Sequence, residues 1–222
     1  MNIIHENSTK QVLIVISSRN PTDCLIHNIT NLQTMQLVDG NTYKIICVDS
    51  DSDNFATYET IKNRFPFVEI HMVKNKNYEY GAYKYAAITY PNYDIYICIQ
   101  DTFLITSRID LRNVNDYTCY SSMHDSGFFS HPEVKEFGKH LLSNTAFESS
   151  SLINTYFTLA MHSSFIVTNK VINDIFRTLI NPPYDKYGSC CYERLFGLYF
   201  ILKGIKTINI NPFAVKVHGG RL

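Results

Sequence analysis

Polar side chains that could bind a charged ligand stand at the ends of three long apolar runs in this sequence. Ser17 and Ser18 follow "QVLIVI", Asp49 follows "TYKIICV", and Gln100 and Asp101 follow "YDIYICI". A carboxylate at the end of a buried strand is costly unless a positive charge or hydrogen-bond donors pair with it. A carboxylate can also hold a hard divalent cation, which can bridge the oxygens of a diphosphate. The pattern therefore indicates either turn caps or a ligand site.

Glu193 is the residue of the second half that is best suited to proton transfer. It lies in "CCYERLFGLYFILKG", whose apolar residues recur at helical spacing. A carboxylate beside a reacting hydroxyl can act as a general base, although a glutamate in a first helical turn is also favoured by the helix dipole alone. Lys84 and Arg19 could meet phosphate or remain surface charges.

Four strand-length runs and the helix-compatible segments between them predict a mainly parallel sheet. Three of the runs are near-continuous rather than alternating, which is typical of strands covered on both faces. The segments between the runs are long enough for crossover helices. The predicted strands are 11–17, 42–49, 67–73 and 93–100, and the predicted helices are 23–35, 54–64 and 81–89.

The second half of the chain has weaker alternation but still reads as mixed strands and helices. In an open α/β sheet the ligand crevice lies beyond the carboxyl ends of the strands, which is where the polar residues of the first half stand. The predicted strands are 116–123, 164–168, 206–210 and 214–218, and the predicted helices are 132–142, 169–179 and 190–203.

Length and composition predict one domain over residues 1–222. Twenty basic residues offset twenty acidic ones without a long run of either sign, so no nucleic-acid partner is expected. No segment approaches the ~18 apolar residues that cross a bilayer, and "MNIIHENSTKQ" lacks the pattern of an export signal. Six cysteines without a CxxC pair suit a reducing compartment. We therefore expect a cytoplasmic protein without a transmembrane segment.

The turn after the first strand argues against the commonest nucleotide-binding families. "VISSRNPTD" does not contain G-x-G-x-x-G, and G-x-x-x-x-G-K-[ST] occurs nowhere in the sequence. These glycine-rich loops cradle phosphates in dinucleotide enzymes and P-loop NTPases. Neither class is expected.

The strand-end motifs resemble, in their order, those of GT-A-type glycosyltransferases, and specifically the inverting members that use nucleotide-diphosphate sugars. "VISSRN" resembles the turn after the first strand of that family, and "VDSDSDN" resembles the Val-Asp-Asp-Gly-Ser-like turn that holds the nucleobase and ribose. "NYEYGAYKYAA" resembles the turn that opens the helix after the third strand, through Gly81. "ICIQDT" resembles the metal-binding Asp-x-Asp motif in its Asp-Thr variant, through Asp101.

Three downstream segments continue the resemblance in the same order. "MHSSFIVTNKVI" is similar to the acceptor-side motif of the family and contains His162 and Ser163. "YERLFGLYFILKGIK" is similar to the helix headed by a Glu-Asp pair, and it puts Glu193 on the aspartate of that pair. "VKVHGG" places His218 where a late histidine joins the metal shell.

This resemblance implies a single-domain, three-layer α/β/α GT-A fold, which is Rossmann-like, with a mostly parallel central sheet. About 1–101 would form the nucleotide-sugar-binding half and about 102–222 the acceptor-side half. The implied activity moves a hexosyl or deoxyhexosyl group from a UDP, GDP or dTDP sugar to a hydroxyl of a glycan or other acceptor, with inversion and with Mn²⁺ or Mg²⁺. The implied roles are Glu193 as catalytic base, Asp101 and His218 at the metal, His162 and Ser163 on the acceptor side, and Ser17, Ser18, Asp49, Asp51, Lys84, Gln100 and Asp101 around the donor.

Two other functions stay open on the sequence alone. A sugar nucleotidyltransferase shares the sheet but needs a glycine-rich, basic loop after the first strand, and "SSRNPTD" contains no glycine. A non-catalytic nucleotide-sugar or glycan-binding module of the same fold is the other alternative, because the residues immediately before Asp101 supply no second acidic group.

Overall fold

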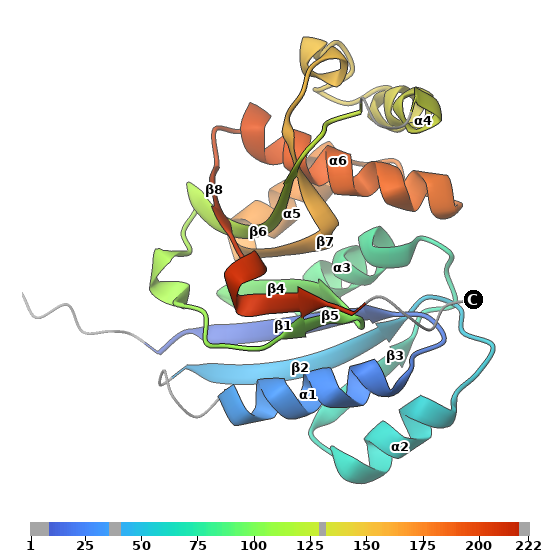
Figure 1. Cartoon of the computed structure of the whole chain (residues 1–222), viewed down its shortest axis with the longest axis vertical. Coiled ribbons are helices and arrows are strands. Elements are labelled where there is room, and N and C mark those ends of the chain that lie inside the picture. The colour runs from blue at the N-terminus through green and yellow to red at the C-terminus, as the bar shows by residue number, and fades with distance from the viewer. Residues whose placement is uncertain (1–8, 36–40, 129–131, 218–222) are drawn as a thin grey trace, which may run out of the picture.

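Four parallel strands form the first half of the main sheet, as the sequence predicts. The structure, a computed structural model, describes residues 9–35, 41–128 and 132–217 (Figure 1). The four carboxyl ends meet at one edge because neighbouring strands pair in parallel. In sheet order the strands are β3 (Val68–Met72), β2 (Thr42–Asp49), β1 (Gln11–Ser18) and β4 (Ile95–Gln100), connected by α1 (Asp23–Met35), α2 (Ala56–Arg64) and α3 (Tyr78–Thr89).

Three more strands extend the sheet beyond β4 in the order β7, β6, β8, and β7 runs against its neighbours. A second, two-stranded sheet joins β5 to β9. The strands are β5 (Phe103–Ile105), β6 (Thr118–Asp125), β7 (Thr158–Thr168), β8 (Lys206–Asn209) and β9 (Ala214–Lys216). The helices are α4 (Pro132–Leu142), α5 (Asn169–Thr178) and α6 (Lys186–Leu202), with short 3-10 turns η1 (Leu111–Asn113), η2 (Ser151–Asn154) and η3 (Asn211–Phe213).

Two hydrophobic cores, one on each face of the sheet, make the fold three-layered. Alternate residues of β1 point to opposite faces: Leu13 and Val15 pack with α3, α5 and α6, whereas Ile14 and Ile16 pack with α1 and α2. Figure 1 shows these two groups of helices on opposite sides of the sheet. The predicted α/β fold with a mostly parallel sheet is confirmed.

Three elements begin earlier than predicted. The helix expected over 81–89 starts at Tyr78. The helix expected over 190–203 starts at Lys186, because the carboxylate of Asp185 accepts a hydrogen bond of 2.7 Å from the backbone N–H of Gly188 and so caps the helix. Glu193 therefore lies in the helix interior, and the alternative of a first-turn glutamate is wrong. The strand expected over 164–168 starts at Thr158 and contains an irregularity that the sequence does not predict.

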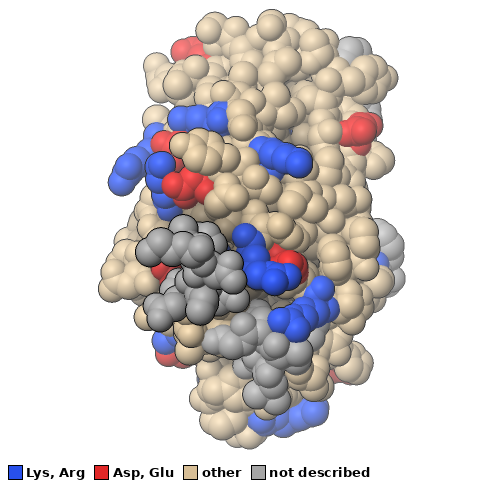
Figure 2. Space-filling view, turned by 90° about the vertical axis from the view of Figure 1, so that its left-hand side faces the viewer, with Lys and Arg blue, Asp and Glu red and all other residues tan. Residues whose placement is uncertain are grey.

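Charged side chains are mixed on the face of the molecule at the amino ends of the parallel strands. Figure 2 shows lysines and arginines there among acidic and uncharged residues, without forming one continuous block on the part that is not grey. Within the described part of the chain, no helix has the length and apolar character needed to cross a bilayer.

The close approach of α6 to β7 depends on Gly197. A Cβ atom at this position would lie 2.5 Å from the carbonyl oxygen of Thr158 and 2.6 Å from Cα of Leu159. Both neighbouring atoms are backbone, so they cannot move aside as a flexible side chain could. The glycine thus fixes how deeply α6 seats on the sheet.

The substitution Gly197→Ala is expected to lower the free energy of unfolding by about 3 kcal/mol, because the added methyl overpacks a contact between two backbones. Urea unfolding followed by circular dichroism measures the loss. The matched control is Gly204→Ala, where a Cβ meets nothing within 4 Å and only the positive φ of 65° opposes it; about 1 kcal/mol is expected there. Equal losses in the two variants would contradict the packing argument.

Candidate functional site

Asp101 and the end of β1 form the centre of the polar edge. The Asp101 side chain is buried, with 2% of the residue exposed. Its Oδ2 accepts a hydrogen bond of 3.1 Å from the Ser18 hydroxyl, and its backbone N–H donates to the Ser17 carbonyl at 2.9 Å. Because β1 and β4 are neighbouring parallel strands, the structure brings Ser17, Ser18, Gln100 and Asp101 together as the sequence predicts.

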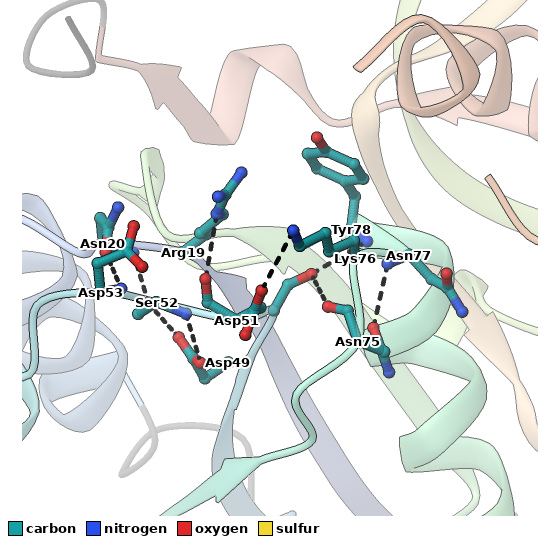
Figure 3. A network of polar contacts seen from close by, with 11 residues as sticks. Arg19, Asn20, Asp49, Asp51, Ser52, Asp53, Asn75, Lys76, Asn77 and Tyr78 are labelled. Carbon is teal, nitrogen blue, oxygen red and sulfur yellow. Dashed lines mark hydrogen bonds and ion pairs between the residues drawn. The ribbon is translucent and has the colours of Figure 1, made fainter. Parts of the chain in front are cut away.

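Asp49, at the end of β2, is satisfied by its own loop and by Tyr58 of α2. Its carboxylate accepts hydrogen bonds from the Ser52 backbone N–H at 2.9 Å and from the Ser52 hydroxyl (Figure 3). It also accepts a hydrogen bond of 2.7 Å from the Tyr58 hydroxyl. Only 2% of Asp49 is exposed. These bonds make Asp49 the anchor that shapes the turn after β2, and they direct its oxygens into the protein.

The turns after β1 and β2 are tied to each other through Asn20. Its backbone N–H donates to the Ser52 hydroxyl at 2.6 Å, and its side-chain oxygen accepts from the backbone N–H of Asp53 at 2.8 Å (Figure 3). Asn20 and Asp51 both have positive φ, at 48° and 66°. Asparagine and aspartate tolerate this left-handed conformation better than most residues, so the two turns hold one fixed shape.

Arg19, Asp51 and Tyr78 lie at the exposed side of this loop network. The Arg19 Nε donates to the Asp51 carbonyl at 3.3 Å, and Lys76 forms a long ion pair of 3.8 Å with the Asp51 carboxylate. Figure 3 shows the Arg19 guanidinium and the Tyr78 ring pointing the same way, away from Asp49. The Lys186 ammonium at the start of α6 lies 5.9 Å from the centre of the Tyr78 ring. Cations and an aromatic ring therefore stand together near the strand ends.

A chain of hydrogen bonds connects the end of β4 to α6. Gln100 Nε2 donates to Glu79 Oε1 at 2.7 Å, and the Ser189 hydroxyl donates to Glu79 Oε2 at 3.0 Å. On its other side, Gln100 accepts a hydrogen bond from the Lys216 ammonium of β9. Ser189 precedes Glu193 by one helical turn, so both lie on one face of α6. The chain thus joins the strand end that carries Asp101 to the helix that carries Glu193.

Glu193 carries a largely buried carboxyl group that holds its proton more tightly than usual. Its side chain is 19% exposed. Its pKa is raised to about 7, first by burial and then by the nearby charge of Glu79, while Arg194, Lys186 and the His162 backbone N–H act in the opposite direction. Glu193 Oε1 accepts that N–H at 3.1 Å, and the Arg194 guanidinium is 3.9 Å from the other oxygen. A carboxyl group with a pKa near neutrality is suited to taking up and releasing a proton at physiological pH.

The backbone of β7 is bulged where it meets Glu193. Residues 161–164 face the single residue Ser122, because Ser121 pairs with Phe165 and Met123 pairs with Ala160. His162 and Ser163 both have positive φ, at 57° and 47°, a conformation that costs a non-glycine residue roughly 1–2 kcal/mol. The Ser163 hydroxyl is buried and has no hydrogen-bond partner within the described residues. Consecutive strained residues next to a poorly solvated carboxyl group are typical of functional sites.

Tyr83 lies in the same region as Asp101 and Glu79. It is fully buried, and its pKa is raised well above the usual value, first by burial and then by the neighbouring groups Cys98, Glu79 and Asp101. Its hydroxyl has no hydrogen-bond partner in the part of the chain that the structure describes. The carboxyl groups of Asp101 and Glu79 therefore lie close enough to Tyr83 to act on the same buried hydroxyl.

One described residue of the predicted set, Lys84, is not brought to this group. The Lys84 ammonium contacts the Tyr80 hydroxyl at 3.3 Å and lies over the same ring, so its contacts are with the packing around α5 and α6. His218 lies outside the described residues.

Five residues of the site are not among the site residues predicted from the sequence. They are Glu79, Ser189, Lys186, Tyr78 and Lys216. Glu79 carries one signal that could have identified it, since this glutamate stands two residues before Gly81 and opens the helix after β3.

The side chains around Asp101 could hold a divalent cation only if a bound ligand and waters supply the remaining coordinating atoms. Among the described residues there is no group of three or more His, Cys, Asp or Glu side chains that could hold a metal ion. Mg²⁺ commonly takes one or two carboxylates, with substrate phosphates and waters completing its octahedron. Asp101 with the neighbouring Ser18 hydroxyl fits this shared type of site, whereas it does not fit a cage made by the protein alone.

Comparison with known proteins gives a similarity of fold. No family model matches the sequence, and no curated protein sequence matches it. Among solved structures, the mannosyltransferase PcManGT from Pyrobaculum calidifontis, in complex with GDP-Man and Mn²⁺, is similar with a TM-score of 0.56 and 11% sequence identity. The similarity covers 91% of this chain and 55% of that chain, so this chain spans about half the length of that protein.

Glu193 is expected to make stability depend on pH. The pKa of about 7 in the folded state lies above the ordinary value of 4.5, so the folded state binds more protons between these values and stability falls as the pH rises through this window. The fall amounts to at most about 3 kcal/mol. Urea unfolding from pH 4 to 8 of the wild type and Glu193→Gln measures it. The difference between their free energies of unfolding should change from pH 4.5 to 7 and then level off, and a constant difference would refute the raised pKa.

Proposed function

We propose that this chain is a glycosyltransferase that moves a sugar from a nucleotide-diphosphate sugar to a hydroxyl acceptor, with inversion at the anomeric carbon. The observation that carries the proposal is the link between Asp101 and Glu193. Asp101 directly follows Gln100, which is hydrogen-bonded through Glu79 to Ser189, and Ser189 lies one helical turn before Glu193, a second carboxyl group whose pKa is raised to about 7. The fold shared with a mannosyltransferase that binds GDP-Man supports this choice among α/β functions.

On the donor side, the proposed contacts come from the ends of β1, β2 and β4. Ser17, Ser18 and Gln100 surround Asp101. Arg19 presents its guanidinium on the exposed side of the loop network and suits the diphosphate. Asp49 and Asp51 contribute by shaping the turn after β2 rather than by direct contact, because the Asp49 carboxylate is hydrogen-bonded within the protein. The donor base is among uracil, guanine and thymine.

On the metal side, Asp101 is the described residue that would hold Mn²⁺ or Mg²⁺, with His218 as a further proposed ligand. When bound, such an ion neutralises the charge that develops on the leaving diphosphate. The neighbouring mannosyltransferase is described with Mn²⁺. Lys186 and Arg19 add positive charge near the strand ends, which favours the same anion.

On the acceptor side, Glu193 serves as the general base. The acceptor oxygen bonds to the anomeric carbon as the bond from that carbon to the diphosphate oxygen breaks, and the bonding electrons leave with the diphosphate. The proton of the acceptor hydroxyl passes to the Glu193 carboxylate. The attack comes from the face opposite the leaving group, which inverts the configuration. His162 fixes Glu193 through its backbone N–H, and the next residue, Ser163, supplies a buried hydroxyl.

A non-catalytic nucleotide-sugar-binding module is the second candidate. Asp101 is the single acidic side chain at the end of β4, since Gln100 precedes it. Such a module would bind a nucleotide sugar without releasing the nucleotide diphosphate. A nucleotidyltransferase is less well supported, because the turn after β1 contains no glycine.

Thermal shift with UDP, GDP and dTDP sugars plus Mn²⁺ identifies the donor, since a ligand of the native state raises the unfolding temperature.

With that donor, Glu193→Gln is expected to reduce transfer about 10²–10⁴-fold while binding is kept, because only the proton acceptor is lost. Asp101→Asn is expected to abolish the metal-dependent part of donor binding. Glu136→Gln, an exposed glutamate on α4, is the matched control and should keep full activity. Binding with no nucleotide released by the wild type would favour the module.

A further inference from the structure

Glu79 is a buried carboxylate that joins three elements of the fold. It lies in the first turn of α3 and is 6% exposed. One of its oxygens accepts a hydrogen bond of 2.7 Å from Gln100 at the end of β4, and the other accepts a hydrogen bond of 3.0 Å from Ser189 on α6. Because both oxygens accept, Glu79 behaves as a fixed acceptor within the protein.

The charge of Glu79 is more than these two hydrogen bonds require. A glutamine at this position could accept from Gln100 through its oxygen and donate to the Ser189 hydroxyl through its amide, so packing alone does not call for a carboxylate. Burying an ionisable group is unfavourable unless the charge is compensated or has a use. Glu79 is hydrogen-bonded to Ser189, one helical turn before Glu193 on the same face of α6, and this position suggests such a use.

The groups that face Glu193 come from three elements. From α3, Glu79 acts to raise the pKa of Glu193; from α6, Lys186 and Arg194 act to lower it; and from β7, the His162 backbone N–H also lowers it. The charges of Glu193 and Glu79 both act to raise the pKa of the Cys190 thiol on α6, so the two carboxyl groups act on the same side chain. Burial is the largest cause of the raised Glu193 pKa, and Glu79 is the next.

We propose that Glu79 is a positioning residue for Glu193, which holds the first turns of α6 against the end of β4 and presents a like charge to the carboxyl group that accepts the proton. This inference rests on the proposed function, in which Glu193 takes the proton of the acceptor. In that role, Glu79 acts through Glu193 and touches neither sugar. It also couples the donor edge to the acceptor side, because Gln100 adjoins Asp101.

The test replaces the charge and keeps the shape. In Glu79→Gln, the titration midpoint of the Glu193 carboxyl carbon, followed by ¹³C NMR and assigned with Glu193→Gln, is expected to fall by about one pH unit. The acid limb of the pH profile of kcat/KM should move to lower pH by the same amount. The control Ser189→Ala removes one hydrogen bond and keeps the charge, so it should leave the midpoint unchanged.

If Glu79→Gln does not fold, a second variant, Glu79→Asp, tests the same inference. Glu79→Asp keeps the charge but withdraws it by one methylene, and the midpoint should then fall by about half a unit. An unchanged midpoint in a folded Glu79 variant overturns the inference. The NMR titration does not need turnover, so a shifted midpoint in a protein without transfer activity would sink the proposed function and leave the positioning role standing.

Discussion

The proximity of two poorly solvated carboxyl groups, Glu79 and Glu193, is the constraint on which the candidate site depends. Like charges in such a place repel each other, so the pair persists only where the surrounding structure holds it. The holding groups are neutral donors on one side, from Gln100 and Ser189, and a backbone N–H with two cations on the other. Part of the repulsion is relieved when Glu193 keeps a proton, and this is one reason why the pKa of Glu193 is raised to about 7.

The fold supplies this arrangement through one strand that runs against the others. The reversal of β7 brings its bulge, residues 161–164, to the level of the carboxyl end of β4, because Cys98 pairs with Phe165 and the two strands run in opposite directions. The bulge aims the N–H of His162 at Glu193. Gly197, one turn beyond Glu193, lets α6 approach β7 closely enough for that contact. The strained backbone of β7 and the glycine at position 197 of α6 therefore both contribute to the contact between His162 and Glu193.

Much of this architecture is predictable from the sequence, and the remainder is not, for identifiable reasons. Three of the four parallel strands carry apolar runs with polar residues at their ends, so the sequence alone places Ser18 and Asp101 at one edge. The start of α6 escapes prediction because Asp185, its cap, is three residues from a glycine rather than from a glutamate or glutamine. Lys216 escapes it because its partner Gln100 is distant in the chain, and no local pattern reports such a contact. Asp49 is predicted correctly at its strand end, but only the structure reveals that Ser52 of its loop and Tyr58 of α2 satisfy its carboxylate.

The two-stranded sheet has a consequence for how the protein acquires its final form during synthesis. β9 pairs with β5, and its Lys216 bonds both Gln100 and Thr102, more than a hundred residues earlier. A chain that emerges amino-terminus first can assemble β1 to β4 while β9 is still inside the ribosome, since domains form progressively during translation. The strand end that carries Asp101 therefore gains its lysine partner after the four parallel strands, and a nascent chain released before β9 would lack the Lys216 contacts with Gln100 and Thr102.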